Sequence, residues 1–289
     1  DLVGVYTWVN IGGLVAIFFA PLSGLLIKSF SIVPVVRILY LVFAVNMFIK
    51  VLITYRYCDE TRQGKIRITE TKDISIFQML FEYKSLVPKV LKNKEIMKVV
   101  IVSVILYITN IVNTNFFSLY VTQRLGISDS YLAFFPILNA AVMLIFMIGI
   151  QHRLESVKFR LPMWIGLVLH ATGSILLILA PIGSLTIIII YVFVGAVASA
   201  LIAPRKDALI QLNINPKERA RINALIMAST IAFASPFGYF AGWLSSIDRR
   251  LPFVFIFVIF IIAIIIVGSI REPEFDNDNS EIVNTLASG

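Results

Sequence analysis

Five residues between positions 107 and 117 form the richest polar and aromatic set within an apolar run: Tyr107, Asn110, Asn113, Thr114 and Phe117. They recur at spacings of three and four, which places them broadly on one face of a helix. A phenol, two amides, a hydroxyl and an aromatic ring can hydrogen-bond to and stack on an uncharged solute, such as a sugar or a neutral amphiphile. The alternative is that these groups join neighbouring helices by hydrogen bonds. Both interpretations stay open on the sequence.

Two later apolar runs carry residues that could extend this face. Asn139 lies in the middle of one run, where it could add an amide or serve packing alone. Tyr191, Gly195 and Ser199 follow one another at i, i+4 and i+8, so a phenol stands above a line of small residues. Small residues let a solute or another helix approach closely. Of these two interpretations, we favour close packing of helices.

A proline divides another apolar run and suggests a bend. Pro236 removes one backbone hydrogen bond from a helix, and membrane helices use such positions for bending. Ser229, Thr230 and Phe233 precede it in the same helix, and we expect Ser229 and Phe233 to line a cavity beside a gate. His170 lies near the centre of a further run, where we favour a neutral imidazole bonded to a neighbouring helix over a proton relay.

Several classes of chemistry have no matching residues. One cysteine, Cys58, excludes an internal disulfide framework, and the two histidines form no set with metal-ligand spacing, so we expect no metal and no cofactor. We find no nucleophile, metal site or carboxylate pair at membrane depth, which argues against an enzyme. The net charge of +8 would suggest nucleic acid in a soluble protein, but here the basic residues lie in short segments between apolar runs.

The apolar runs themselves predict the architecture. Hydrophobic residues make up 58% of the chain and the mean hydropathy is +0.90, which is more apolar surface than a soluble core can bury. A membrane span needs roughly 20 apolar residues in a helix, and no run alternates as barrel strands do. We therefore predict an all-α membrane helix bundle with eight spans, none of which contains aspartate or glutamate. The runs are Leu2–Ile27, Ile32–Tyr55, Ile96–Val121, Tyr131–Ile150, Leu161–Ala180, Leu185–Ala203, Ile222–Leu244 and Phe253–Ile270.

The distribution of lysine and arginine predicts the orientation. One side of the predicted membrane carries most of these residues, including nine between Arg56 and Lys94, and basic loops face the cytoplasm. Both termini of the chain are then cytoplasmic, in a multi-pass protein of the cell membrane. Residues 58–95 form a cytoplasmic connection, amphipathic from Ile74 to Leu91, which either lies on anionic lipid or forms an ordinary linker helix. Residues 271–289 are acidic and polar, and we expect a disordered tail.

A faint internal repeat points to a known family. Ala20-Pro21-Leu22-Ser23-Gly24 in the first run is similar to Ser235-Pro236-Phe237-Gly238 with Gly242 in the seventh run, six spans later, and each precedes one more span. The segment from Asn215 to Arg221, which includes Arg219, resembles the cytoplasmic loop before helix eleven of the major facilitator superfamily. The chain resembles that superfamily over nearly its whole length.

The resemblance implies a twelve-helix transporter of which this chain holds helices five to twelve, as a fragment. It implies that residues 1–57 end the first six-helix bundle and that residues 96–270 form the second. It also implies alternating access, no covalent reaction, a small-molecule solute and a monomer. Hinge positions would be Pro21, Gly24, Pro236, Gly238 and Gly242, and cytoplasmic loop positions would be Arg153, Arg160, Arg219 and Arg221.

The match departs from the family pattern in two places. The loop before position 161 keeps Gly149, Arg153 and Arg160 but lacks the family's aspartate and second glycine, and the first run has too few glycines for the antiporter signature. The rival hypotheses are a receptor or scaffold that does not transport, recruiting a lipid or a partner through its basic loop, and a membrane enzyme. The sequence predicts a secondary transporter over both.

Overall fold

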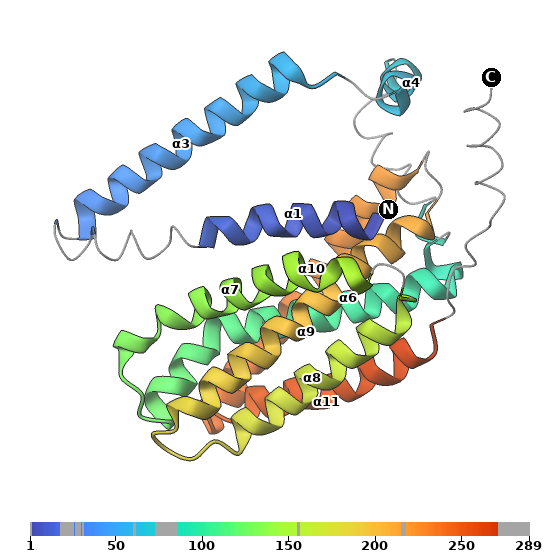
Figure 1. The fold of residues 1–289 in the computed structure, drawn as a ribbon. Helices are drawn as coiled ribbons and strands as arrows, with labels where there is room; N and C mark the ends of the chain where they lie inside the picture. The colour runs from blue at the N-terminus through green and yellow to red at the C-terminus, as the bar shows by residue number, and fades with distance from the viewer. Residues whose placement is uncertain are drawn as a thin grey trace.

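The computed structural model describes residues 2–17, 26, 30, 32–59, 62–72, 86–88, 90–154, 157–214 and 218–270. Within these residues every regular element is helical, and no strand occurs (Figure 1). The α-helices are α1 (Leu2–Ile17), α3 (Ile32–Tyr57), α4 (Arg62–Thr71), α6 (Lys94–Leu119), α7 (Phe134–Gly149), α8 (Arg160–Ile178), α9 (Leu185–Leu212), α10 (Arg219–Ile247) and α11 (Leu251–Gly268). Shorter helical segments are a π-helix at Tyr120–Arg124 and two 3-10 turns at Asp129–Tyr131 and Gln151–Leu154.

The helix lengths suit a membrane. Seven helices among the described residues are long and apolar enough to cross a bilayer, and the shortest of them has 18 residues. At 1.5 Å per residue, about 20 residues span the hydrocarbon core. The prediction of an all-helical membrane bundle is confirmed. The predicted first span, Leu2–Ile27, is described as a continuous helix only to Ile17, and most of its outer half lies outside the described residues.

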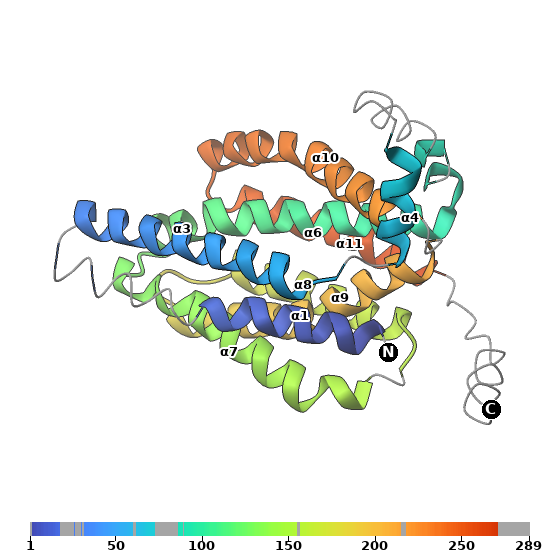
Figure 2. The same cartoon turned by 90° about the horizontal axis from the view of Figure 1, so that it is seen from above.

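Helices α6 to α11 form one bundle, and α1 packs onto it. In Figure 1 the bundle helices run side by side along one direction, and Figure 2 shows the same group from above. Helix α8 packs against α9 and α11, α6 packs against α10 and α11, and α7 packs against α9. Helix α1 lies against α7 and α9, whereas α3 runs apart from the bundle with its side chains exposed from Arg37 to Tyr57.

The two ends of the bundle differ in charge. The starts of α6, α8 and α10 and the end of α9 lie at one end, where Lys94, Arg160, Arg205 and Arg219 gather. This basic end of the bundle also carries the turn after α7. Helix α6 begins there with an Asn93 cap, whose side-chain oxygen accepts from the backbone N–H groups of Glu95 and Ile96, each at 3.1 Å. Such a cap satisfies donors that a helix start leaves without partners.

Helix α9 is longer than the sequence predicted. The sequence predicts a span that ends at Ala203 and a loop that contains Arg205 and Lys206, but the helix continues to Leu212 and contains Pro204 in its interior. The helix therefore carries a carboxylate, Asp207, beyond the end of the predicted span. Arg205 has hydrogen-bond partners within the fold, since its guanidinium donates to the carbonyl oxygens of Leu201 at 3.1 Å and Leu154 at 2.9 Å.

The segment between α3 and α6 contains a helix that the sequence did not predict. Helix α4 covers Arg62–Thr71, a stretch whose polarity suggested only a loop. Most of the predicted amphipathic helix from Ile74 to Leu91 lies outside the described residues, as do Pro21, Gly24 and the acidic tail from 271.

Candidate functional site

A large cavity lies between the bundle and α1, among the residues that the structure describes. Its volume is about 1310 Å³, and its walls come from α1, α6, α7, α8, α9 and α10. Apolar side chains such as Leu14, Leu106, Met143 and Ile226 make up much of the wall. The polar groups in it therefore stand out, because hydrocarbon surroundings make an unpaired polar group costly.

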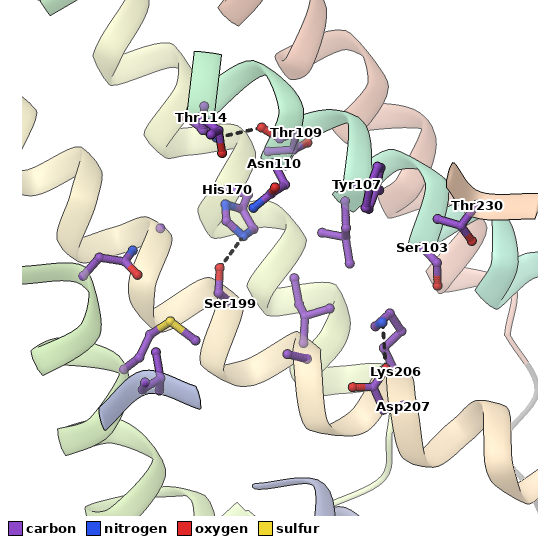
Figure 3. A pocket seen from close by; sticks show the side chains of 18 of the residues that line it. Ser103, Tyr107, Thr109, Asn110, Thr114, His170, Ser199, Lys206, Asp207 and Thr230 are labelled. Atoms are coloured by element: carbon purple, nitrogen blue, oxygen red, sulfur yellow. Dashed lines mark hydrogen bonds and ion pairs between the residues drawn. The ribbon is translucent and has the colours of Figure 1, made fainter. Parts of the chain in front are cut away.

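Helix α6 supplies the face that the sequence indicated. Tyr107, Asn110, Asn113, Thr114 and Phe117 all line the cavity, as their helical spacing predicts for one face. Figure 3 shows Tyr107, Asn110 and Thr114 on the same stretch of α6.

A hydrogen bond and a ring stack fix part of this face. The Tyr191 hydroxyl on α9 donates to Asn113 Oδ1 at 2.6 Å, and Asn113 Nδ2 donates to the carbonyl of Thr109 at 3.1 Å. The Phe117 ring stacks on Tyr191 with centroids 5.7 Å apart, and its edge meets Phe135 of α7. The Asn113 amide is thus both a bond between helices and part of the cavity wall, so the two interpretations of this residue are compatible.

We expect Tyr191→Phe to loosen this corner of the cavity. The change removes the donor and leaves Asn113 Oδ1 without its partner, at a cost of about 1–2 kcal/mol in the free energy of unfolding. Thermal unfolding of the purified variant measures this. Tyr239→Phe is the control, because Tyr239 lies in α10 with its side chain exposed and does not line the cavity. Equal melting temperatures for the two variants would contradict the assigned bond.

The structure places Asn139 on the cavity but not Ser229 or Phe233. Asn139 of α7 is a lining residue. Helix α10 turns a neighbouring face inward, and the Phe233 side chain is 68% exposed. The residues of α10 that line the cavity are Asn223, Ile226, Met227, Thr230 and Ile231. Their spacing of three and four residues indicates this face, and Thr230 is the one residue of the group before Pro236 that lies on it.

The glycines beyond Pro236 bring α10 close to α6. A methyl group on Gly238 would lie 3.4 Å from Ile111, and one on Gly242 would lie 3.7 Å from Phe116. Pro236 lies inside the continuous helix α10. This part of α10 combines close packing with a missing backbone donor, which is where membrane helices bend.

His170 bonds to the neighbouring helix. Its Nε2 lies 3.3 Å from the Ser199 hydroxyl of α9, as Figure 3 shows, and its ring stacks on Phe260 of α11 with centroids 5.0 Å apart. The imidazole also lines the cavity. The ring is thus held by two helices at the cavity wall.

The charged residues of the wall were missed by sequence reasoning. Lys206 and Asp207 of α9 line the cavity toward the basic end, and Lys206 Nζ lies 2.7 Å from Asp207 Oδ1 (Figure 3). Gln211 lies one turn further along the same wall. The sequence does indicate that these charged residues share a helix face with Tyr191 and Gly195, because Ser199, Lys206 and Asp207 continue the same helical spacing.

Two of the four predicted loop arginines make contacts at the basic end of the bundle. Arg219 donates from Nη2 to the carbonyl of Gln211 at 3.2 Å, and Arg221 lies 3.9 Å from Glu218 Oε1. Arg153 is exposed, and Arg160 starts α8.

Among the residues that the structure describes, no group of three or more His, Cys, Asp or Glu side chains could hold a metal ion. The wall thus offers hydrogen bonds, ring faces and one ion pair to a bound molecule.

Comparison with known proteins gives one family. The model of the Major Facilitator Superfamily matches residues 3–229, more than half of the 289-residue chain. No curated protein and no solved structure gives a significant match. The match agrees with an all-helical bundle of candidate membrane spans around a cavity. The chain therefore belongs to the major facilitator superfamily and is a multi-pass membrane transporter.

Proposed function

We propose that this protein moves a small solute through the central cavity by alternating access, as a secondary transporter. The observation that carries the proposal is the cavity itself, about 1310 Å³ in volume and walled by membrane-spanning helices. Binding sites for small molecules are concave and mostly apolar, with a few placed polar groups, and this cavity has that character. The solute site then lies between the polar face of α6 and the facing residues of α7 and α9.

The Tyr191–Asn113 bond supports a site with fixed geometry. It holds an amide and a phenol at the cavity wall, and the Phe117 ring stacks beside them. A solute with hydroxyl or amide groups and an apolar part would find partners without first reorganising the wall, which lowers the cost of binding. The α6 face carries no full charge, so the solute is one with no net charge.

Bending of α10 would accompany the change of access. Pro236 leaves one carbonyl of the helix without its usual donor, and Gly238 and Gly242 let α10 move over α6 at short distance. The basic end would face the cytoplasm, because lysine and arginine concentrate there.

Uptake into proteoliposomes tests this proposal. The panel is hexoses, nucleosides and amino acids, all small and without net charge. We expect uptake of at least one, and we expect Thr114→Trp to abolish that uptake because the indole covers the polar face of α6 where the solute would bind. Asn115→Trp is the matched control, since Asn115 is the next residue of α6 and is exposed but does not line the cavity.

Two results would count against the proposal. Uptake that survives Thr114→Trp would place the pathway elsewhere. Intact, inserted protein that takes up no member of the panel would instead favour a receptor or scaffold.

A further inference from the structure

The wall of the cavity carries a second, charged group of residues at its basic end. Lys206, Asp207 and Gln211 all line the cavity from α9, away from the neutral face of α6. Of lysine, arginine, aspartate and glutamate, the described lining contains Lys206 and Asp207 alone. Ionisable residues within membrane helices are costly to place there, and they mark pathways for solutes and ions.

The two charges already balance each other. Lys206 Nζ lies 2.7 Å from Asp207 Oδ1, so this part of the wall carries no net charge. A solute with one charge would leave one member of the pair without compensation once it broke the bond between them. A zwitterion would replace the bond completely, because its ammonium group can bind Asp207 while its carboxylate binds Lys206.

Gln211 provides an independent reason to expect a donor from the ligand. Its side chain is 5% exposed, and its Oε1 atom is a buried acceptor without a hydrogen-bond partner. Arg219 does not bond to this oxygen, since its Nη2 donates to the backbone carbonyl of Gln211 and its buried Nε has no hydrogen-bond partner. Asp207 and Gln211 are four residues apart in one helix and so lie on the same face, one turn from each other. Gln211 Oε1 is itself buried, so an ammonium group in the cavity would donate to both oxygens once the Gln211 amide turned toward it.

From these observations we propose that Lys206, Asp207 and Gln211 form a subsite for the ammonium and carboxylate groups of a zwitterionic solute with an apolar body, of the amino acid class. The proposal rests on the cavity being the solute pathway, as proposed above. Lys206 binds the carboxylate, and Asp207 and Gln211 accept from the ammonium. The adjacent apolar wall, which includes Ile202, Ile210 and Met227, receives the apolar part.

Ligand-dependent thermal stabilisation of the purified protein tests the subsite. The probes are alanine, valine, leucine and phenylalanine, together with leucine methyl ester, which lacks the carboxylate, and N-acetylleucine, which lacks the ammonium. We expect at least one of the free amino acids to raise the melting temperature. We expect the two blocked leucines to bind about tenfold or more weakly than leucine, because each loses one set of charged hydrogen bonds.

Variants of the pair separate this subsite from a general effect of charge. Asp207→Asn and Lys206→Gln should each weaken binding of the free amino acid about tenfold or more, while Asp207→Glu should keep most of it. The matched controls are Glu95→Gln and Lys98→Gln, since the Lys98–Glu95 pair has the same chemistry at 2.9 Å, with similar partial exposure, but does not line the cavity. The controls should bind as the parent protein does.

The outcomes distinguish this inference from the proposed function. If no free amino acid stabilises the protein, or if all variants bind it equally, the zwitterion subsite is wrong. The proposed transport would still stand after that result if the protein took up a hexose or a nucleoside and Thr114→Trp abolished the uptake. Loss of both uptake and binding in well-folded protein would overturn the two together.

Discussion

Replacing Gly166 with leucine is expected to prevent α8 from packing on α9. Gly166 is buried between the helices, and even a methyl group there would lie 2.7 Å from Ile202 Cγ1 and 2.9 Å from the backbone oxygen of Ala198. The backbone oxygen cannot move without shifting α9. Gly166→Ala should therefore lower the free energy of unfolding by about 1–3 kcal/mol, and Gly166→Leu by more. Thermal or detergent-induced unfolding of the purified variants measures both.

Gly173→Ala is the matched control on the same helix. Its methyl group would meet Tyr191 Cδ2 at 3.5 Å, an ordinary contact distance. Alanine also favours a helix over glycine by about 1 kcal/mol, so this variant should be neutral or slightly stabilised. If Gly166→Ala and Gly173→Ala unfold alike, the close contact between α8 and α9 is misplaced.

Replacing Arg205 with alanine is expected to destabilise the basic end of the bundle by about 3 kcal/mol, since each hydrogen bond to a charged group contributes roughly 1.5–3 kcal/mol. The guanidinium is 1% exposed and bridges two carbonyl oxygens, those of Leu201 within α9 and Leu154 in the turn after α7. Its removal takes a charged donor from both carbonyl oxygens, of which the Leu154 oxygen keeps the backbone N–H of Val157 at 3.1 Å, and empties the buried space that the side chain fills. The midpoint of unfolding in a denaturing detergent titration reports the loss.

Two further variants define what Arg205 does. Arg205→Lys keeps the charge, but a single ammonium cannot reproduce the fork of the guanidinium, so its stability should fall between the parent and Arg205→Ala. Arg153→Ala removes an exposed arginine next to Leu154 and should change the free energy of unfolding by less than about 0.5 kcal/mol. Similar losses in Arg153→Ala and Arg205→Ala would mean that net charge, and not the bridge between α9 and the turn, stabilises this end.

The fold could be predicted because the membrane imposes a simple rule. Runs of about 20 apolar residues must form helices to satisfy their backbone groups, and the sequence contains such runs with turn residues between them. The cavity face of α6 followed for a related reason, since polar side chains in a membrane helix gather on the face that avoids lipid. The spacing of Tyr107, Asn113 and Thr114 was therefore enough to predict that they share one face of α6.

The end of α9 could not be predicted from composition. Arg205, Lys206 and Asp207 in succession look like a loop, and they remain helical because the fold supplies partners that the local sequence does not reveal. The prediction that Ser229 and Phe233 of α10 line the cavity was wrong for another reason. Ser229, Thr230 and Phe233 all precede Pro236, but proximity to a bend does not give the rotation of a helix, and of the three only Thr230 lines the cavity.

Labelling of a cysteine in the cavity from each side of the membrane tests the central claim most directly. Cys58 is the single cysteine of the chain, so Cys58→Ser gives a background without thiols, into which Asn139→Cys and Ile145→Cys are introduced separately. Both positions belong to α7, but Asn139 lines the cavity and the exposed Ile145 does not. Alternating access predicts that an impermeant thiol reagent modifies Asn139→Cys from either side, in right-side-out and in inside-out vesicles, and leaves Ile145→Cys unmodified from both. Modification of Asn139→Cys from one side only, or from neither, would contradict the account.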